Sequence, residues 1–155
     1  MKKIFLIFVL LFCACSEEKM SALNSKELIM IKFDAKQKAI KGINEAFMLF
    51  FYTQDCGVCN EQIPILNELN KENKIKLIAV LGGARDYLDA KKKLKGVEFA
   101  TIYDPNDVEY LSSIVGGIYG VPAMFIYDKE GKLKKRFLSL TPKSVLLKEI
   151  NLLNS

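Results

Sequence analysis

The 155-residue chain contains no histidine and no tryptophan, and it has only four cysteines. A structural zinc site takes four ligands, usually two Cys-x-x-Cys pairs or one such pair with two histidines. Without imidazoles or a second pair of this spacing, a zinc site within one chain is excluded. A copper-chaperone site is excluded on the same ground, because such sites add imidazole or methionine-rich clusters. We therefore expect no metal and no other cofactor.

A strong excess of one charge is also absent. The chain has 23 basic and 18 acidic residues, a formal charge of +5, and half of its residues are hydrophobic. If a leader that contains the lysines at positions 2 and 3 is removed, 21 basic and 18 acidic residues remain, a formal charge of +3. Because the lysines are spread along the chain, this mild excess gives no argument for a nucleic-acid partner. The length and composition suit one domain with a full core.

The chain begins with a short hydrophobic stretch. The uncharged run from Ile4 to Cys15 is shorter than the roughly 20 residues that a membrane-spanning helix needs. Two preceding lysines and the small residue Ala14 make this stretch typical of a secretory signal. The sequence "LFCACSEE" resembles a bacterial lipobox, in which Cys15 is acylated and becomes the first mature residue. Phe12 departs from the usual leucine, and a plain secretory signal is the alternative.

The lipobox resemblance divides the chain into three parts. These are a lipoprotein signal peptide (1–14), an acylated N-terminus with a polar tether (15–25) and a folded domain (26–155). Acyl chains add about 0.8 kcal/mol of membrane affinity per buried methylene, so several chains on Cys15 anchor firmly. The domain would then lie at the extracytoplasmic, periplasmic face of a membrane, where disulfides persist.

Hydrophobic patterning predicts alternating strands and helices. Strands are predicted at 27–33, 46–53, 76–82, 97–104, 123–128 and 132–140, and helices at 56–73, 86–95, 108–115 and 141–153. This order, with its closing hairpin and helix, predicts an α/β fold with a mixed central sheet flanked by helices. Pro64 conflicts with the first helix, which it should kink.

Cys56 and Cys59 enclose "CGVC" directly after the strongest predicted strand. A purely structural disulfide is the simplest interpretation, but a bridge across three residues removes little entropy from the unfolded chain. A mature domain of roughly 140 residues does not need such a bridge. In the redox interpretation, Cys56 opens a helix, where unpaired N–H groups and the positive helix end lower its pKa below about 8.5. Cys56 then attacks a partner's disulfide as the nucleophile, and Cys59, one turn later and shielded, resolves the mixed disulfide.

A second segment agrees with the redox interpretation. "YGVPAMFIYDKEGKL", residues 119–133, places "GVP" before an apolar strand and "YDKEGKL" after it, and Pro64 follows Cys59 by five residues. With "CGVC", these features make residues 27–153 similar to the thioredoxin superfamily. Within it they resemble the membrane-anchored TlpA/ResA/CcmG-like thiol–disulfide oxidoreductases. The 63 positions from Cys59 to Pro122 exceed the spacing in plain thioredoxin.

The resemblance implies a thioredoxin-like fold with an extra strand–helix insertion between the Cys-x-x-Cys helix and the proline strand. It also implies that Pro122 is a cis-proline beside the cysteines. Val121 would then offer its backbone to an extended substrate segment, in the manner of strand addition. An ordinary trans-proline at the start of an edge strand is the alternative. The partners implied are protein thiols or disulfides and a membrane electron donor.

Several positions depart from the family pattern. Asp55 precedes Cys56 where members usually carry tryptophan, and Phe50 replaces the buried acid or asparagine of the central strand. Gln62 stands where an acid often follows the second cysteine, and helix geometry points the neighbouring Glu61 away. The proton acceptor for Cys59 is therefore not identified by the sequence.

Gly57 and Val58 between the cysteines add no charge, whereas strong oxidants commonly place a histidine there. Potentials in the superfamily run from about −270 to about −120 mV, and we expect a disulfide reductase toward the reducing end. Cytochrome c maturation is one pathway that the family suggests. One alternative is a peroxiredoxin-like peroxidase using Cys56 of "TQDC", although only Arg85 and Arg136 are available to polarise a peroxide. The other is a non-catalytic thioredoxin-fold lipoprotein scaffold.

Overall fold

The computed structural model describes residues 17–153. The predicted signal peptide and the predicted lipidation site Cys15 lie outside the described residues. Within residues 17–153, no helix combines the length and the apolar character needed to cross a membrane.

A six-stranded mixed sheet forms the centre of the molecule, in the order β2-β7-β6-β5-β8-β9. Its strands are β2 (Ala22–Leu23), β5 (Phe47–Thr53), β6 (Lys76–Gly82), β7 (Ala100–Ile102), β8 (Ala123–Tyr127) and β9 (Leu133–Phe137). β5, β6 and β7 run parallel, and the remaining pairings are antiparallel. The sheet is thus mixed, as predicted.

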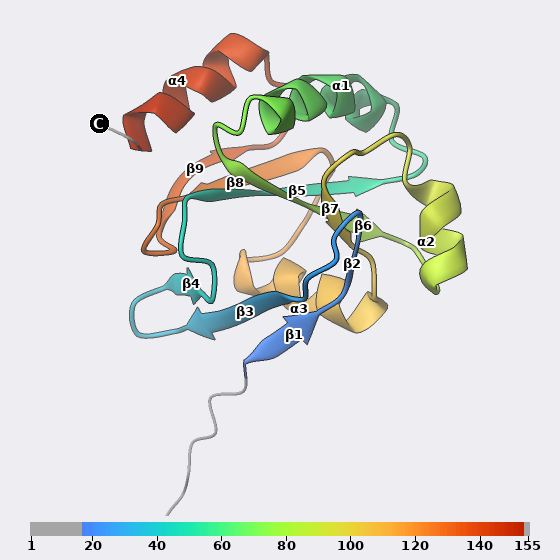
Figure 1. Cartoon of the computed structure of the whole chain (residues 1–155), viewed down its shortest axis with the longest axis horizontal. Coiled ribbons are helices and arrows are strands. Elements are labelled where there is room, and N and C mark those ends of the chain that lie inside the picture. Colours follow the sequence, from blue (N-terminus) through green and yellow to red (C-terminus); the bar gives the residue numbers. More distant parts are fainter. Residues whose placement is uncertain (1–16, 154–155) are drawn as a thin grey trace, which may run out of the picture.

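Helices and a smaller sheet cover the two faces of this central sheet (Figure 1). α1 (Gly57–Lys71) and α4 (Lys143–Leu153) lie on one face. On the other lie α3 (Pro105–Ile114) and a three-stranded sheet of β1 (Glu18–Met20), β3 (Ile29–Asp34) and β4 (Ala39–Lys41). The short α2 (Tyr87–Lys93) follows β6. Between α1 and β8 the chain forms β6–α2 and then β7–α3, which confirms the predicted additional strand–helix unit.

β5 is the central strand because both of its faces are apolar. Six of its seven residues are buried. Phe50 and Tyr52 pack with α1, whereas Leu49 and Phe51 belong to the core on the α3 side. The sequence of a strand that is buried on both faces is continuously apolar, without alternating apolar and polar residues. The end of β5 therefore places the following turn, with Cys56, against the buried core.

α1 buries one face through residues at helical spacing, among them Cys59, Ile63 and Leu66. The helix is continuous from Gly57 to Lys71 although Pro64 lies inside it. Pro64 is on the exposed side of the helix, where water can satisfy the carbonyl group that loses its helical N–H partner. Cys59 lies on the opposite, buried side of α1, within the core.

The N-terminal part of the domain differs from the sequence prediction. The predicted polar tether at 15–25 includes two strands, β1 and β2, and the side chains of Met20 and Leu23 are buried. β4 is also absent from the predicted strands. These strands are only two or three residues long, so they carry no periodic hydrophobic signal. The part of the chain that the structure describes therefore has folded strands before residue 26.

Candidate active site

Cys56 and Cys59 form a disulfide at the N-terminus of α1, with their Cα atoms 5.2 Å apart. Cys56 is the N-cap residue, with extended backbone angles (φ −86°, ψ 101°), and its side chain accepts a hydrogen bond from the helix. The turn is closed by the Cys56 N–H, which donates to the Thr53 carbonyl at the end of β5. The strand and the helix together fix the position of the pair.

The two sulfurs differ in their access to solvent. Cys59 is completely buried (0% exposed), whereas Cys56 is half-buried. The residues around Cys56 in the sequence are open: Asp55 and Gly57 are exposed, and Val58 is 45% exposed. An incoming partner can therefore reach Cys56 and not Cys59.

The backbone provides the electrostatics at Cys56. The Cys59 N–H donates to the Cys56 sulfur at 3.1 Å. The Asn60 N–H donates to the Cys56 carbonyl at 3.2 Å, which begins the helical hydrogen bonding. No acidic residue lies in the first turn of α1. When the disulfide is reduced, the N–H group and the positive end of the helix favour thiolate over thiol at Cys56.

The loop before β8 reaches the same place. The Val121–Pro122 peptide bond is cis, which confirms that sequence prediction, and Pro122 is buried. The Val121 carbonyl oxygen lies 3.6 Å from the Cys56 sulfur, although the two residues are 65 positions apart. The backbone groups of Val121 take no part in β8, which begins at Ala123. The fold thus brings all four predicted site residues of the described chain together.

Gln62 is a residue whose role the sequence did not reveal. It is completely buried one turn after Cys59. Its Nε2 donates to the Thr141 carbonyl at 3.2 Å, and its Oε1 accepts the Thr141 N–H at 2.7 Å. The Thr141 hydroxyl donates to the Ser139 carbonyl. Gln62 therefore ties α1 to the segment before α4, and both of its polar atoms are occupied.

The core beside the disulfide is apolar. Phe50 stacks on Tyr52 with ring centroids 5.2 Å apart, and the Tyr52 hydroxyl donates to the Leu94 carbonyl. Burial raises the pKa of Tyr52, so its hydroxyl stays protonated. Glu61 is exposed, and no carboxylate among residues 17–153 is buried. A buried carboxylate that could accept the Cys59 proton is thus absent from the described core.

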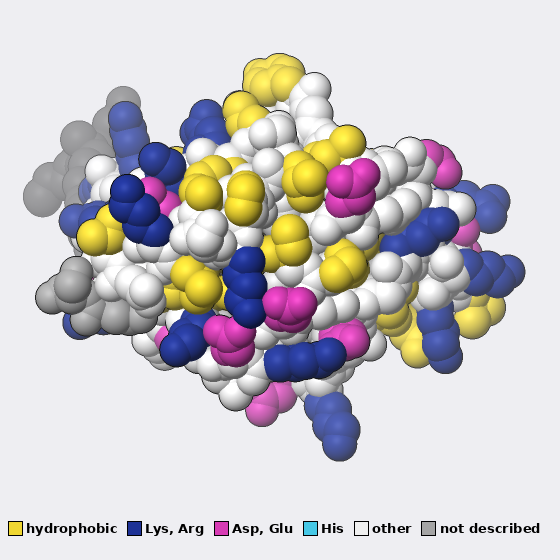
Figure 2. Space-filling view, turned by 90° about the horizontal axis from the view of Figure 1, so that it is seen from above, with side chains coloured by type: hydrophobic (Ala, Val, Ile, Leu, Met, Phe, Trp, Pro, Cys, Tyr) yellow, Lys and Arg dark blue, Asp and Glu magenta, His cyan; other side chains and the backbone are white. Residues whose placement is uncertain are grey.

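Apolar side chains are exposed near the site. Besides Val58, these include Leu138 and Leu140. Leu140 adjoins Thr141, the residue that Gln62 holds. Figure 2 shows the face covered by α1 and α4, where apolar side chains gather among charged ones. Exposed apolar side chains of this kind suit contact with a protein partner.

A metal site and a peroxidase site are the two other kinds of chemistry to compare with these residues. Among the described residues, no cluster of three or more His, Cys, Asp or Glu could hold a metal ion. Arg85 pairs with Asp89, and the Arg136 guanidinium lies over the Phe125 ring at 5.4 Å. Among the described residues, neither arginine forms a hydrogen bond or an ion pair with Cys56.

Comparisons with known proteins agree with this architecture. The family model of TraF, an F plasmid transfer operon protein, matches residues 17–85, which include both cysteines. A candidate thiol:disulfide interchange protein DsbE from Chlorobium tepidum is 21% identical, with a TM-score of 0.66 over 91% of this chain and 95% of that chain. StoA from Bacillus subtilis is 15% identical, with a TM-score of 0.65 over 87% of this chain and 96% of that chain.

A third similar structure is the pneumococcal exposed lipoprotein thioredoxin Etrx1 from Streptococcus pneumoniae. It is 19% identical, with a TM-score of 0.64 over 88% of this chain and 98% of that chain. The chain has a thioredoxin-like fold. This confirms the fold predicted from the sequence, and the Cys-x-x-Cys pair lies at the start of α1 in this thioredoxin-like domain.

Proposed function

We propose that the chain is a thiol–disulfide oxidoreductase that exchanges disulfides with partner proteins through Cys56 and Cys59. The observation that carries this proposal is the unequal pair of bonded sulfurs at the N-terminus of α1. Cys56 is only half-buried and its sulfur accepts a backbone N–H, whereas Cys59, one turn away, is completely buried. A structural disulfide needs no such asymmetry, whereas thiol exchange needs one attacking and one protected thiol.

The exchange balances in two steps. The reduced Cys56 thiolate attacks a sulfur of the partner's disulfide, so that a mixed disulfide forms and the partner's second sulfur leaves as a thiolate. Cys59 then loses its proton and attacks the Cys56 sulfur. The Cys56–Cys59 disulfide forms, and the partner's first sulfur leaves as a thiolate. Two electrons pass to the partner, and the same steps in reverse oxidise it.

Val121 positions the substrate in this proposal. Its carbonyl lies 3.6 Å from the Cys56 sulfur, and its backbone groups form no backbone–backbone hydrogen bond among residues 17–153. An extended segment of the partner can pair with these groups while its own sulfur meets Cys56. The role assigned to Pro122 is to shape this loop beside the disulfide.

The direction that we propose is reduction of the partner. Gly57 and Val58 add no positive charge that would stabilise the reduced thiolate further, unlike the histidine of strong oxidants. Equilibration with glutathione redox buffers measures the potential, and we expect a value nearer the thioredoxin end, about −270 mV, than the DsbA end, about −120 mV. A potential near the DsbA end would reverse the assigned direction and leave the exchange chemistry intact.

We further propose that residues 1–14 are a signal peptide and that acylated Cys15 anchors the domain at the extracytoplasmic face. A membrane protein would then supply the electrons, and the thiols of apocytochrome c are one substrate class consistent with this location. The lipobox-like sequence supports the anchor, and one similar structure belongs to an exposed lipoprotein thioredoxin. Metabolic labelling with a radioactive fatty acid tests it: the label should be present on the unaltered protein and absent after Cys15→Ser.

The trapping experiment tests the central proposal. In intact cells, Cys59→Ser should accumulate mixed disulfides through Cys56 that a reductant releases, and the matched variant Cys56→Ser should accumulate none. Reduction of insulin disulfides should require both cysteines. If Cys59→Ser formed no adducts, the scaffold interpretation would replace this proposal. Peroxide consumption that survives Cys59→Ser would instead indicate a peroxidase.

A further inference from the structure

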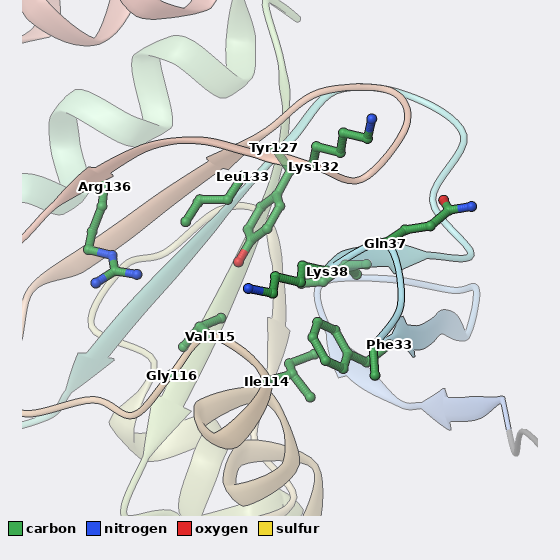
Figure 3. Close-up of a pocket in the computed structure, with 12 residues that line it drawn as sticks. Phe33, Gln37, Lys38, Ile114, Val115, Gly116, Tyr127, Lys132, Leu133 and Arg136 are labelled. Carbon is green, nitrogen blue, oxygen red and sulfur yellow. The ribbon is translucent and has the colours of Figure 1, made fainter.

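A pocket of about 560 Å³ lies on the α3 side of the central sheet, away from the α1 and α4 face (Figure 3). The turn between β3 and β4, the C-terminal end of α3 and the β8–β9 hairpin enclose it. This volume falls within the range of roughly 300 to 1,000 Å³ that is typical of small-molecule sites.

A backbone contact joins two of the segments that line this pocket. The Ile40 N–H donates to the Gly131 carbonyl at 2.8 Å, which joins β4 to the β8–β9 turn. Ala39 also bridges to Lys132 on the same hairpin. The pocket walls are therefore connected through backbone hydrogen bonds and are formed in the absence of a ligand.

Tyr127 directs a hydroxyl group into this pocket (Figure 3). The side chain is only 3% exposed, and its ring stacks on Phe47 with centroids 4.8 Å apart and planes 10° apart. No hydrogen-bond partner for the hydroxyl is present within the described part of the chain. Burial raises the pKa of Tyr127, so the hydroxyl remains a donor. Among residues 17–153 no fully buried side-chain nitrogen or oxygen lacks a hydrogen-bond partner, so the Tyr127 oxygen is open to the pocket and can donate to a ligand there.

Three cations line the same pocket without any acidic side chain: Lys38, Lys132 and Arg136. None of them forms an ion pair with a carboxylate among residues 17–153. In Figure 3, Lys38 and Arg136 lie on opposite sides of the Tyr127 hydroxyl. The guanidinium of Arg136 rests over the Phe125 ring, which orients it while leaving its N–H groups free for an anion.

The neighbouring lysines of β9 differ in this respect. Lys134 pairs with Asp128 at 3.1 Å, and Lys135 pairs with Glu149 at 3.9 Å. The three cations that line the pocket thus differ from these two neighbours in having no carboxylate partner among residues 17–153. The rest of the pocket is largely apolar, with Phe33, Ile114 and Leu133 among the side chains that form its walls.

We propose that this pocket binds a small carboxylate with an apolar body, an aryl or medium-chain alkyl acid. The carboxylate accepts hydrogen bonds from Tyr127, Lys38 and Arg136, and the apolar body lies against Phe33 and Ile114. The site is separate from the disulfide and does not depend on the redox role proposed above.

Titration of the ¹⁵N-labelled protein with 4-phenylbutyrate, followed by ¹H–¹⁵N correlation spectra, tests this site. We expect shifts at the amides of 115–116, 127 and 132–136, with a Kd of about 1 mM or below. The neutral analogue 4-phenylbutan-1-ol should bind about tenfold more weakly, because it cannot accept charge-assisted hydrogen bonds.

Matched variants locate the anion. Arg136→Gln and Tyr127→Phe should each raise the Kd for 4-phenylbutyrate about fivefold or more. Lys92→Gln, which removes an exposed cation on α2, should leave it unchanged. If Tyr127→Phe fails to fold, two measurements still test the carboxylate site. These are the Kd of Arg136→Gln and the comparison of the acid with the alcohol on the unaltered protein. Equal binding of acid and alcohol, shifts centred elsewhere, or no shifts at all would overturn the proposal.

Discussion

Replacement of Gln62 by glutamate should make the stability of this protein depend on pH. The substitution keeps the shape of the side chain and changes one amide donor into a carboxyl oxygen. In the unaltered protein, the amide group holds both the carbonyl and the N–H of Thr141. A protonated carboxyl can keep both hydrogen bonds, but an ionised one cannot donate to the Thr141 carbonyl and repels it instead.

The sign and size of the effect follow from this geometry. Position 62 is completely buried, so burial and the facing carbonyl raise the pKa of the new carboxyl in the folded state above its unfolded value of about 4.3. Stability is then fully present below the unfolded value and is lost as pH rises toward the folded value. Each pH unit in that window costs about 1.4 kcal/mol. At pH 7 the loss therefore reaches at most about 3.7 kcal/mol.

Urea unfolding of the oxidised protein, followed by circular dichroism at pH 4.5 and pH 7, measures this loss. The quantity to compare is the difference in unfolding free energy between Gln62→Glu and the unaltered protein at each pH. Gln37→Glu changes the charge equally at an exposed position, and its difference should be small at both values. A loss that is the same at both pH values, or larger at pH 4.5, would refute the proposed role of Gln62.

Two other predictions concern the turn of the β8–β9 hairpin and the contact between α1 and α4. Gly131 has φ +79° and a Cβ there would collide with the Ile40 backbone, whereas Gly83 has φ +80° and open space around it. In urea unfolding, Gly131→Ala should lower the unfolding free energy more than Gly83→Ala does. Gly83→Ala should lose only the conformational cost of about 1–2 kcal/mol. Equal losses would show that the Ile40 contact is unimportant. The Lys143 ammonium donates to both Glu68 and Glu72, and its hydrogen bond lowers the pKa of Glu72 below 4.5. This stabilisation is present above pH 4.5 and disappears as pH falls through the lowered value, so Lys143→Gln should destabilise the protein at pH 7 and have little effect near pH 3. An equal effect in thermal unfolding at both pH values would contradict that assignment.

Local sequence patterns were sufficient to predict β5 and α1, the two elements that position the disulfide. The apolar run of β5 is long enough to show burial on both faces, and α1 repeats its buried residues at helical spacing. The cis bond at Pro122 and the extra strand–helix unit were correctly predicted from the family resemblance. By contrast, β1, β2 and β4 escaped prediction, because strands of two or three residues show no period.

The sequence by itself determined which two sulfurs can bond, because three residues span one helical turn and bring Cys59 back beneath Cys56. Only the tertiary structure decided what surrounds them. The Val121 carbonyl reaches Cys56 across 65 positions, and Gln62 holds Thr141 across 79. The Tyr127 hydroxyl, which has no hydrogen-bond partner within residues 17–153, and the pocket that it faces are equally invisible in the sequence. Such contacts depend on the order of strands in the sheet and on the helices packed against it. Neither can be predicted from the spacing of residues along the chain.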